Sequence, residues 1–400
     1  MKINTDEKAI DKFLTRGVEM VYPSAEKLKE KLMSGERLRI YQGFDPTGPY
    51  LHVGHAMGIR AMKILQELGH EVIFLVGDYT AKVGDPDKKD AREKLTDEEI
   101  ENNMTGWKEQ AAQLIDFEGE NPVLFKRNFE WLSKLKLNNV IELMSKMTVQ
   151  QMLKREMFNR RIKEGNPIGL QEFIYPLMQG YDGVAMEVDM EIGGADQTFN
   201  MLVGRDLSRA YLNKEKFVRT NKMMDAPDGI TMSKTKGNGI NLGDSAEEMY
   251  GKAMSYPDTA IASGLELLTD YPIEKIDEIH TKIKEGINPV NFKKIMAFEV
   301  VKTIKGEVEA KKAEESFKIQ FQEKGVPKTL EIFVVENLGV LDVLVDTKLV
   351  NSKSEARRKI EEGAVKINDK KITDYKYEID FKNGEDLILK LGRKIIKICQ

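Results

Sequence analysis

The run GFDPTGPYLHVGH at residues 43–55 constrains the fold more than any other part of the chain. A strand-like segment at 37–41 precedes it, a helix-like segment at 54–68 follows it, and the apolar run at 71–77 then predicts a second strand. A strand, a helix and a strand in this order form a βαβ unit, so we expect a parallel sheet. The turn before the helix would present backbone N–H groups and the positive end of a helix dipole, which together bind phosphate well.

A second strand–turn–helix pattern lies near the middle of the chain. Residues 184–192 (VAMEVDMEI) alternate as a strand does, the turn GGADQ follows at 193–197, and the sequence then reads as helix as far as Tyr211. Two such halves are typical of a doubly wound sheet, so the fold class we expect is α/β with a Rossmann-like parallel sheet. Residues 1–36 read as helical, and residues 96–165 read as a mostly helical insert.

The remainder of the chain predicts two further domains. Residues 226–243 are rich in glycine and read as a mobile loop at the end of a catalytic domain, 1–243. An α-helical domain is expected at 244–325 and a small α+β domain at 335–400. In the last domain VLDVLVDTKLV and SKSEARRKIEEG predict helices, whereas VKIND, ITDYKYEI and EDLILKL predict strands. This domain is the relatively basic part of a chain with net charge −4, so contact with nucleic acid would come from local patches.

Composition argues against several classes of protein. The single cysteine, Cys399, excludes a disulfide framework and a zinc site built from several cysteines. No apolar run approaches the roughly 18 residues of a membrane span, and the polar start of the chain, with Asp6 and Glu7, resembles no targeting peptide. We therefore expect a cytoplasmic protein with no membrane span and no bound metal.

Three motifs in order, HVGH at 52–55, GGADQ at 193–197 and MSKTKGN at 232–238, resemble those of class I aminoacyl-tRNA synthetases. Within that class, GFDPTGPYLHVGH, YPLMQGYD and EIGGADQ are similar to tyrosyl-tRNA synthetases of the bacterial type, and the tail resembles an RNA-binding fold shared with a small-subunit ribosomal protein. The resemblance implies that the chain activates L-tyrosine with ATP and Mg2+, releases pyrophosphate, and transfers tyrosine to the 3′ end of tRNA(Tyr). It also implies no tightly bound cofactor, and a homodimer whose contact lies in the insert at 96–165.

The resemblance assigns the ATP site to the two strand–turn–helix motifs. Thr47 and His52 would bind the γ-phosphate, His55 would contact the ribose side, and Asp196 would accept from the ribose 2′-hydroxyl. Positioning and charge stabilisation would supply the rate, because adenylation needs no protein nucleophile. Taken alone, the histidines could be turn residues and Asp196 a helix cap. The implied ATP-binding set is Gly43, Asp45, Thr47, His52, His55, Gly194, Asp196 and Lys234.

The resemblance also assigns the amino-acid site. Tyr41 and Asp182 would hydrogen-bond the phenolic hydroxyl of the substrate; phenylalanine would leave both unpaired, an effect for which tyrosyl-tRNA synthetase is itself the known illustration. Tyr175 and Gln179 share a helix face with Asp182 at i, i+4 and i+7, and with Asp85 they would hold the substrate ammonium. Taken alone, Tyr41 could be a core aromatic and Asp85 a loop residue. The implied tyrosine-binding set is Tyr41, Asp85, Tyr175, Gln179, Asp182, Glu191 and Gln197.

Two positions depart from the family's usual pattern. The mobile loop commonly reads Lys-Met-Ser-Lys-Ser, but this chain has Thr231 in place of the first lysine. Which cation replaces that lysine stays open, and the candidates are Lys88, Lys89 and Arg92. Glu191 stands where the best-known members have glutamine, and its charge either strengthens amine binding or points away from it. The implied catalytic set is Thr47, His52, His55, Lys89, Lys234 and Thr235.

The tail carries a basic helix. Lys353 and Arg357 are spaced i, i+4 on one face, Arg358 lies beside them, and Ala356 and Ile360 are expected to pack inward. These three basic residues are the predicted RNA contacts, because a basic helix beside a sheet suits the phosphates and sugars of structured RNA. A solvated helix face is the alternative, since nearby glutamates dilute the charge.

Two other functions compete with the synthetase. One is a non-catalytic RNA-binding protein built on the same fold, and the intact set of candidate residues disfavours it. The other is a tryptophanyl relative or another nucleotidyltransferase with an HxGH turn. Such a protein would need neither the pair Tyr41 and Asp182 nor the RNA-binding tail.

Overall fold

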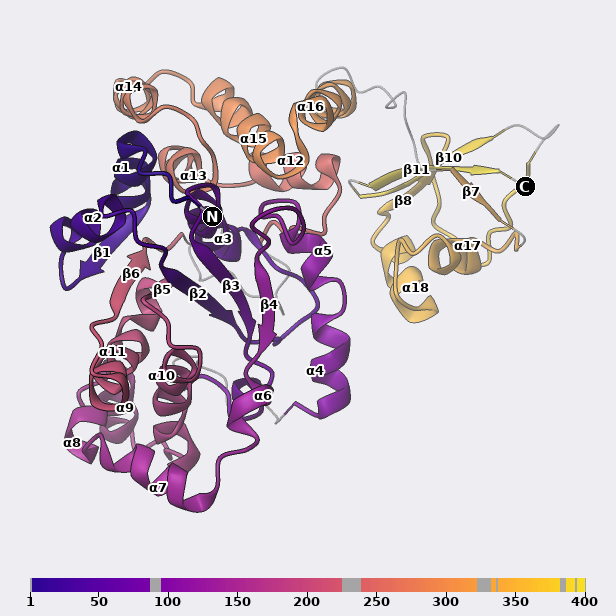
Figure 1. Cartoon of the computed structure of the whole chain (residues 1–400). Helices are drawn as coiled ribbons and strands as arrows, with labels where there is room; N and C mark the ends of the chain where they lie inside the picture. Colours follow the sequence, from indigo (N-terminus) through magenta and orange to yellow (C-terminus); the bar gives the residue numbers. More distant parts are fainter. Residues whose placement is uncertain are drawn as a thin grey trace. The chain divides into compact units, whose positions relative to one another are not determined.

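The computed structural model describes residues 2–86, 95–224, 239–321, 332–335, 337–381, 386–392 and 394–399 (Figure 1). The chain divides into two compact units, Met1–Ala313 and Glu314–Gln400. Each unit combines helices with a sheet, which confirms the α/β class with a smaller α+β part at the C-terminus. Within these described ranges, no helix is both long and apolar enough to cross a bilayer.

A six-stranded sheet forms the centre of the first unit, with the strand order β1-β6-β5-β2-β3-β4 (Figure 1). All neighbouring pairs are parallel except β1 and β6, as the βαβ pattern predicts. The chain leaves β2 toward β3 on one side and leaves β5 toward β6 on the other, so ligands are expected beyond the carboxyl ends of β2 and β5. The strands are β1 (Val18–Tyr22), β2 (Arg39–Phe44), β3 (Glu71–Val76), β4 (Leu124–Arg127), β5 (Met190–Gly194) and β6 (Phe217–Asn221).

Three helices position the candidate residues. Helix α3 (Val53–Glu67) follows β2 and helix α11 (Thr198–Leu212) follows β5, so the two strand–turn–helix motifs open beside each other. Helix α10 (Tyr175–Ala185) has a proline, Pro176, in its first turn, where the missing N–H is tolerated. It packs closely on α11, because a Cβ on Gly180 would lie only 3.0 Å from the Cα of Gly204.

The remaining helices of the first unit surround the sheet (Figure 1). Those between residues 246 and 321 confirm the helical character predicted for that stretch, and α16 continues into the second unit. Their bounds are α1 (Glu7–Thr15), α2 (Ala25–Met33), α4 (Asp97–Met104), α5 (Trp107–Ala111), α6 (Phe129–Leu132), α7 (Leu137–Ser145), α8 (Val149–Met152), α9 (Glu156–Lys163), α12 (Ala246–Met254), α13 (Ile261–Leu268), α14 (Ile273–Lys284), α15 (Val290–Lys305) and α16 (Glu307–Phe321). Short 3-10 turns span Thr80–Lys82, Leu170–Phe173, Ala195–Gln197 and Asp258–Ala260.

Two segments predicted to be helical contain strands. β1 interrupts residues 1–36 and pairs with β6, and β4 lies inside the insert at 96–165 and pairs with β3. The mostly helical character of both segments is confirmed, but the two strands were missed for the same reason. These strands are only four or five residues long, and their partners are distant in sequence. Strand pairing of this kind overrides a weak local preference.

The strand predicted at 184–192 begins too early. Helix α10 continues to Ala185, Glu187 turns the chain with a φ of 53°, and β5 starts only at Met190. The alternating apolar residues of this stretch are nevertheless all buried. The alternation therefore reflects burial of one side of a helix end, a turn and the start of a strand, and only residues 190–192 are extended.

The second unit contains a five-stranded sheet with the order β7-β11-β10-β8-β9. The structure confirms both predicted helices and the predicted strands VKIND and EDLILKL. Ala356 and Ile360 pack inward as expected. The predicted strand ITDYKYEI is wrong: it forms turns and one isolated bridge, from Glu378 to Gly339, while its end residues Ile372 and Ile379 enter the core. The bounds are β7 (Ile332–Val334), α17 (Val340–Asp346), α18 (Lys353–Glu361), β8 (Val365–Ile367), β9 (Lys370–Lys371), β10 (Leu387–Leu391) and β11 (Lys394–Cys399).

A buried histidine predicts how the stability of the first unit depends on pH. The Nδ1 of His70 accepts the backbone N–H of Leu38 at 3.2 Å, and burial lowers the pKa of His70 to about 4. Between pH 6.5 and 4 the unfolded chain would therefore bind a proton that the folded chain does not. The free energy of unfolding should fall as pH drops through this window, by about 3 kcal/mol.

Urea unfolding measured across this pH range tests that expectation. His70→Asn should flatten the dependence, whereas His280→Asn, a change at an exposed position on α14, should leave it as it is in the unaltered chain. Parallel curves for His70→Asn and the unaltered chain would contradict the assignment.

Candidate active site

The two histidines of the HVGH motif cap helix α3. The Nδ1 of His52 accepts the N–H of Gly54 at 3.1 Å, and the Nδ1 of His55 accepts the N–H of His52 at 3.0 Å. The ring centroids lie 3.9 Å apart. Because each Nδ1 is an acceptor, each neutral imidazole carries its proton on Nε2. The start of α3 thus provides two imidazole N–H donors together with the positive end of the helix dipole.

Part of the predicted catalytic set lies outside the described residues. This applies to Lys89, Lys234 and Thr235 of that set, and Lys88, Arg92 and Thr231 lie outside the described residues as well. The chain on either side of residues 225–238 is described. Asn221 pairs with Gly194 at the end of β5, whereas Ile240 accepts the backbone N–H of Val53 at 2.9 Å. The described residues on either side of this segment, Asn221 and Ile240, therefore each contact one of the two strand–turn–helix motifs.

Asp182 lies buried on α10, with only 3% of its surface exposed. The indole N–H of Trp131 donates to its Oδ1 at 2.7 Å, and the side-chain amide of Asn128 donates to its Oδ2 at 3.2 Å. Burial raises the pKa of Asp182 well above its usual value, and these two donors oppose that rise. The carboxyl is thus held in one orientation, and each oxygen keeps a further lone pair for a ligand.

Tyr41 lies on β2 close to Asp182 and is 1% exposed. Its hydroxyl donates to the backbone oxygen of Gln179 on α10 at 3.4 Å, a long hydrogen bond. Burial raises the pKa of Tyr41 well above its usual value, with the charges of Glu191 and Asp182 acting in the same direction. The hydroxyl therefore stays protonated at neutral pH.

A hydrogen-bond chain joins Asp182 to Asp45 at the end of β2. Asn128 donates to the hydroxyl of Thr80 at 3.0 Å, and that hydroxyl donates to Asp45 Oδ1 at 2.8 Å. The other Asp45 oxygen accepts the hydroxyl of Tyr175 at 2.8 Å. A residue predicted for the ATP site is thus tied directly to one predicted for the tyrosine site.

Asp85 meets Gln197 across the carboxyl ends of the strands. The Nε2 of Gln197 donates to Asp85 Oδ2 at 2.7 Å, and Asn200 donates to Gln197 Oε1 at 3.0 Å. The buried guanidinium of Arg155 lies 3.8 Å from Asp85 Oδ1. Asp196 lies next to Gln197 and is exposed.

Glu191 on β5 is held by two neighbouring side chains. Its Oε1 accepts the side-chain amide of Gln179 at 3.1 Å, and its Oε2 lies 2.5 Å from the ammonium of Lys216. The glutamate is therefore buried beside the candidate tyrosine site, and a lysine balances its charge.

The other glycine and hydroxyl candidates lie at the same edge of the sheet. Gly43 is exposed near the end of β2, the N–H of Thr47 donates to the backbone oxygen of Asp45 at 2.8 Å, and Gly194 ends β5. Gly43, Thr47 and Gly194 therefore lie near the carboxyl ends of β2 and β5, beside the two strand–turn–helix motifs.

A cavity of about 590 Å3 lies apart from these residues and is lined in part by Arg16 and Arg60. Both arginines are committed to the last carbonyls of α13: Arg16 donates to Leu265 and Glu266, and Arg60 donates to Leu267. None of the described candidate residues lines this cavity. The two arginines are thus used to cap a helix and are not available for a ligand. We therefore place the active site at the strand ends, where the candidate residues lie.

Sequence reasoning missed the residues that hold the candidates in place. Trp131 and Asn128 lie in the segment taken as a helical insert, and Arg155 lies among other charged residues there. Lys216 stands directly before the fully buried strand β6, and a lysine at the start of a buried strand is the one local signal available.

Comparison with known families identifies the group to which this geometry belongs. Residues 33–322 match the family described as tRNA synthetases class I (W and Y). The chain belongs to this family. Residues 318–396 match a second family, the tyrosine–tRNA ligase SYY-like C-terminal domain, so the two matches span most of this class I synthetase.

Relatives with a curated function cover nearly the whole synthetase. The tyrosine–tRNA ligase of Thermotoga maritima is 40% identical over 375 residues, which are 93% of this chain and 92% of that protein. The enzyme of Carboxydothermus hydrogenoformans is 40% identical over 399 residues, 96% of each chain. Tyrosine–tRNA ligase 2 of Clostridium acetobutylicum is 38% identical over 404 residues, 99% of each chain.

Solved structures share the fold. A C-terminally truncated mitochondrial tyrosyl-tRNA synthetase of Aspergillus nidulans aligns with a TM-score of 0.65 at 23% identity, over 78% of this chain and 94% of that one. The tyrosyl-tRNA synthetase of Archaeoglobus fulgidus, complexed with L-tyrosine, aligns with a TM-score of 0.59 at 23% identity, over 78% of this chain and 100% of that one.

Proposed function

We propose that this chain is a tyrosine–tRNA ligase. It converts L-tyrosine and ATP to tyrosyl-adenylate and pyrophosphate, and then transfers tyrosine to the 3′ end of tRNA(Tyr) in the cytoplasm, where charged tRNA is used. Family membership and the curated relatives support the reaction class. The observation that carries the choice of amino acid is the buried pair Tyr41 and Asp182, held by Trp131 and Asn128.

The phenol of the substrate would complete this pair. Its O–H would donate to Asp182, and its oxygen would accept from the hydroxyl of Tyr41. Phenylalanine has no hydroxyl and would leave both groups buried and unpaired, which discriminates strongly without an editing step.

The ammonium of the substrate would bind toward the other end of α10. Among the described residues, Gln179 Oε1 is buried and has no hydrogen-bond partner, so it offers an acceptor there. Asp85 adds a carboxylate, and Tyr175 is fixed by Asp45. A cationic ammonium between such acceptors makes charge-assisted hydrogen bonds, which are stronger than neutral ones.

The chemical step needs no protein nucleophile. An oxygen of the tyrosine carboxylate attacks the α-phosphorus of ATP, a P–O bond forms, and the bond to the β-phosphate breaks as pyrophosphate leaves. The N–H groups of His52 and His55 and the dipole of α3 would stabilise the charge that builds on the phosphates. Thr47, Lys234, Thr235 and Lys89 are proposed to assist. ATP would arrive as its Mg2+ complex, with the metal as part of the substrate.

The nucleoside would lie along the ends of β2 and β5. Exposed Asp196 is placed to accept from the ribose 2′-hydroxyl, as acidic residues do in other nucleotide folds. Gly43 and Gly194 would let the adenosine approach the backbone closely, because glycine has no side chain.

We also propose a division of labour along the chain. Residues 1–243, with the insert at 96–165, would form the catalytic domain, residues 244–325 a helical domain that contacts tRNA, and residues 335–400 an RNA-binding domain. The two family matches, which meet near residue 320, support a separate C-terminal domain.

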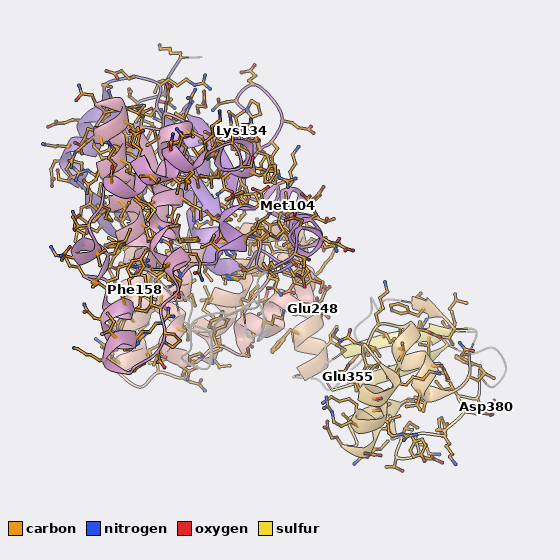
Figure 2. All side chains as sticks on the ribbon, turned by 90° about the horizontal axis from the view of Figure 1, so that it is seen from below. Met104, Lys134, Phe158, Glu248, Glu355 and Asp380 are labelled. Atoms are coloured by element: carbon orange, nitrogen blue, oxygen red, sulfur yellow. The ribbon has the colours of Figure 1, made fainter. Side chains whose placement is uncertain are left out.

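Helix α18 supports the RNA-binding proposal for the tail. The guanidinium of Arg357 lies 4.2 Å from the ring centre of Tyr375, and Arg358 is exposed near it. Glu355, labelled in Figure 2, accepts the backbone N–H of Asn351 at 3.0 Å, so its carboxylate is engaged at the start of the helix. Lys353 is paired with Asp342 and would contribute less.

Removing Arg357 and Arg358 together should weaken binding of tRNA(Tyr) about tenfold and lower its salt dependence, because phosphate contacts release counterions. Pyrophosphate exchange should stay unchanged. Filter binding at several salt concentrations measures this, and an unchanged affinity and salt slope would contradict the assignment.

A homodimer is proposed from the apolar surface of the insert. Leu137 and Ile141 on α7 are 72% and 56% exposed, and Met144 and Val149 add to the same stretch. Such exposure is typical of a protein–protein contact. Sedimentation equilibrium should give a dimer, and Leu137→Lys with Ile141→Lys should give a monomer. A monomeric unaltered chain would overturn the proposal.

Charging of tRNA tests the complete reaction. The chain should attach labelled tyrosine to tRNA(Tyr) and leave a tRNA(Phe) control uncharged. Activation of tyrosine without transfer to tRNA(Tyr) would contradict the second half of the proposed function.

A further inference from the structure

A buried ion pair lies directly beside the candidate tyrosine site. The Nζ of Lys216 is 2.5 Å from Oε2 of Glu191, and the two side chains are 0% and 2% exposed. The attraction within a buried pair often fails to repay the loss of hydration, so such a pair is weak evidence for a contribution to stability. The presence of this buried pair therefore suggests a role other than stability.

Two helices leave room for this lysine. A Cβ on Gly204 of α11 would lie 2.4 Å from the Nζ of Lys216, and a Cβ on Gly183 of α10 would lie 3.3 Å from it. The ammonium thus lies between α10 and α11 where Gly183 and Gly204, which have no side chains, leave room for it. It reaches Glu191 on β5 and also lies 5.9 Å from the ring centre of Tyr41.

The second oxygen of Glu191 fixes the orientation of Gln179. Nε2 of Gln179 donates to Oε1 of Glu191 at 3.1 Å. A carboxylate only accepts, so the amide must present its NH2 to Glu191 and turn its oxygen elsewhere. That oxygen is the buried Oε1 that has no hydrogen-bond partner among the described residues. A glutamine at position 191 would also accept from this NH2 through its amide oxygen, and it would carry no charge to balance.

We propose that Lys216 and Glu191 are positioning residues for the amino-acid substrate. Lys216 holds Glu191, and Glu191 holds the Gln179 amide so that its oxygen faces the substrate ammonium. The inference rests on the proposed function, because it takes Gln179 as an ammonium ligand.

Pyrophosphate exchange, with tyrosine and ATP varied separately, tests this role. Lys216→Met leaves the charge of Glu191 unbalanced and Gln179 unfixed. It should raise the KM for tyrosine by about 30-fold, on the scale of losing one hydrogen bond to a charged group. The kcat and the KM for ATP should change by less than about threefold, since ammonium binding is the same in the ground and transition states.

A second substitution distinguishes positioning from packing. The double variant Lys216→Met with Glu191→Gln contains no unbalanced charge and should recover at least about fivefold of the lost tyrosine affinity. A role in packing alone would lower the melting temperature of both variants, leave the KM for tyrosine unchanged in the folded protein, and show no such rescue. If Lys216→Met does not fold, Glu191→Gln takes its place, with a raised KM for tyrosine expected and rescue again by the double variant.

Lys214→Met is the matched control. Lys214 lies two positions away and pairs with Asp189 at 2.7 Å near the surface, so its loss should leave the KM for tyrosine unchanged. An unchanged KM for tyrosine in folded Lys216→Met, or equal rises for tyrosine and ATP, would overturn the inference alone. Absence of tyrosine-dependent exchange in the unaltered chain would overturn the proposed function and this inference with it.

Discussion

Asp182→Ala is expected to lower the kcat/KM for tyrosine in pyrophosphate exchange by about 1000-fold, or roughly 4 kcal/mol. Two losses combine in this variant. The substrate phenol loses its acceptor, and the N–H groups of Trp131 and Asn128 are left buried without the oxygens that they now bond. ATP affinity should change little, because Asp182 lies on α10 and the ATP site is placed at the ends of β2 and β5.

Asp182→Asn separates these two losses. Its amide oxygen can still accept from Trp131, so the variant should be more stable than Asp182→Ala yet remain impaired with tyrosine. The measurement is the KM for each substrate, together with the melting temperature. If ATP affinity fell in proportion while the KM for tyrosine held, Asp182 would not be the phenol ligand.

His52→Ala should lower the kcat of adenylation by about 100- to 1000-fold, the range seen when one donor to a developing charge is removed. It should also lower the free energy of unfolding by about 1 kcal/mol, because His52 is the N-cap of α3. These effects arise from different ring nitrogens. Nδ1 accepts from Gly54 and caps the helix, whereas Nε2 provides the donor.

His52→Asn tests this division. Asparagine is a strong N-cap, so the stability should return to that of the unaltered chain, but the shorter side chain should leave kcat well below it. Stopped-flow measurement of adenylate formation and thermal unfolding report the two quantities. Recovery of both together would mean that His52 acts only through the helix.

The two strand–turn–helix motifs were predictable because all the residues that define each one lie close together in the sequence. HVGH and GGADQ each combine a preceding strand with glycines and a following helix, and these patterns need no distant partner. The face of α10 was predictable for a similar reason, since Tyr175, Gln179 and Asp182 have helical spacing. β1 and β4 were not, because each is short and depends on pairing with a strand far away in sequence.

The residues that hold the candidate site residues in place could not be predicted from local sequence. Asp182 stood out from its motif, but Trp131 and Asn128 lie 51 and 54 residues away, in a stretch without periodicity that marks them. The charge of Glu191 was visible, yet its partner Lys216 lies 25 residues later and is reached only because α10 and α11 pack through glycines. Burial and pairing of this kind are set by tertiary structure.

Amino-acid-dependent exchange of pyrophosphate with ATP, run with each of the twenty amino acids, tests the central claim most directly. We expect exchange with tyrosine and none above background with phenylalanine or tryptophan, because only tyrosine has a phenolic hydroxyl to bond both Tyr41 and Asp182. Exchange with tryptophan instead would leave the fold intact and contradict the specificity. No exchange with any amino acid, from a folded chain that still binds RNA, would contradict catalysis itself.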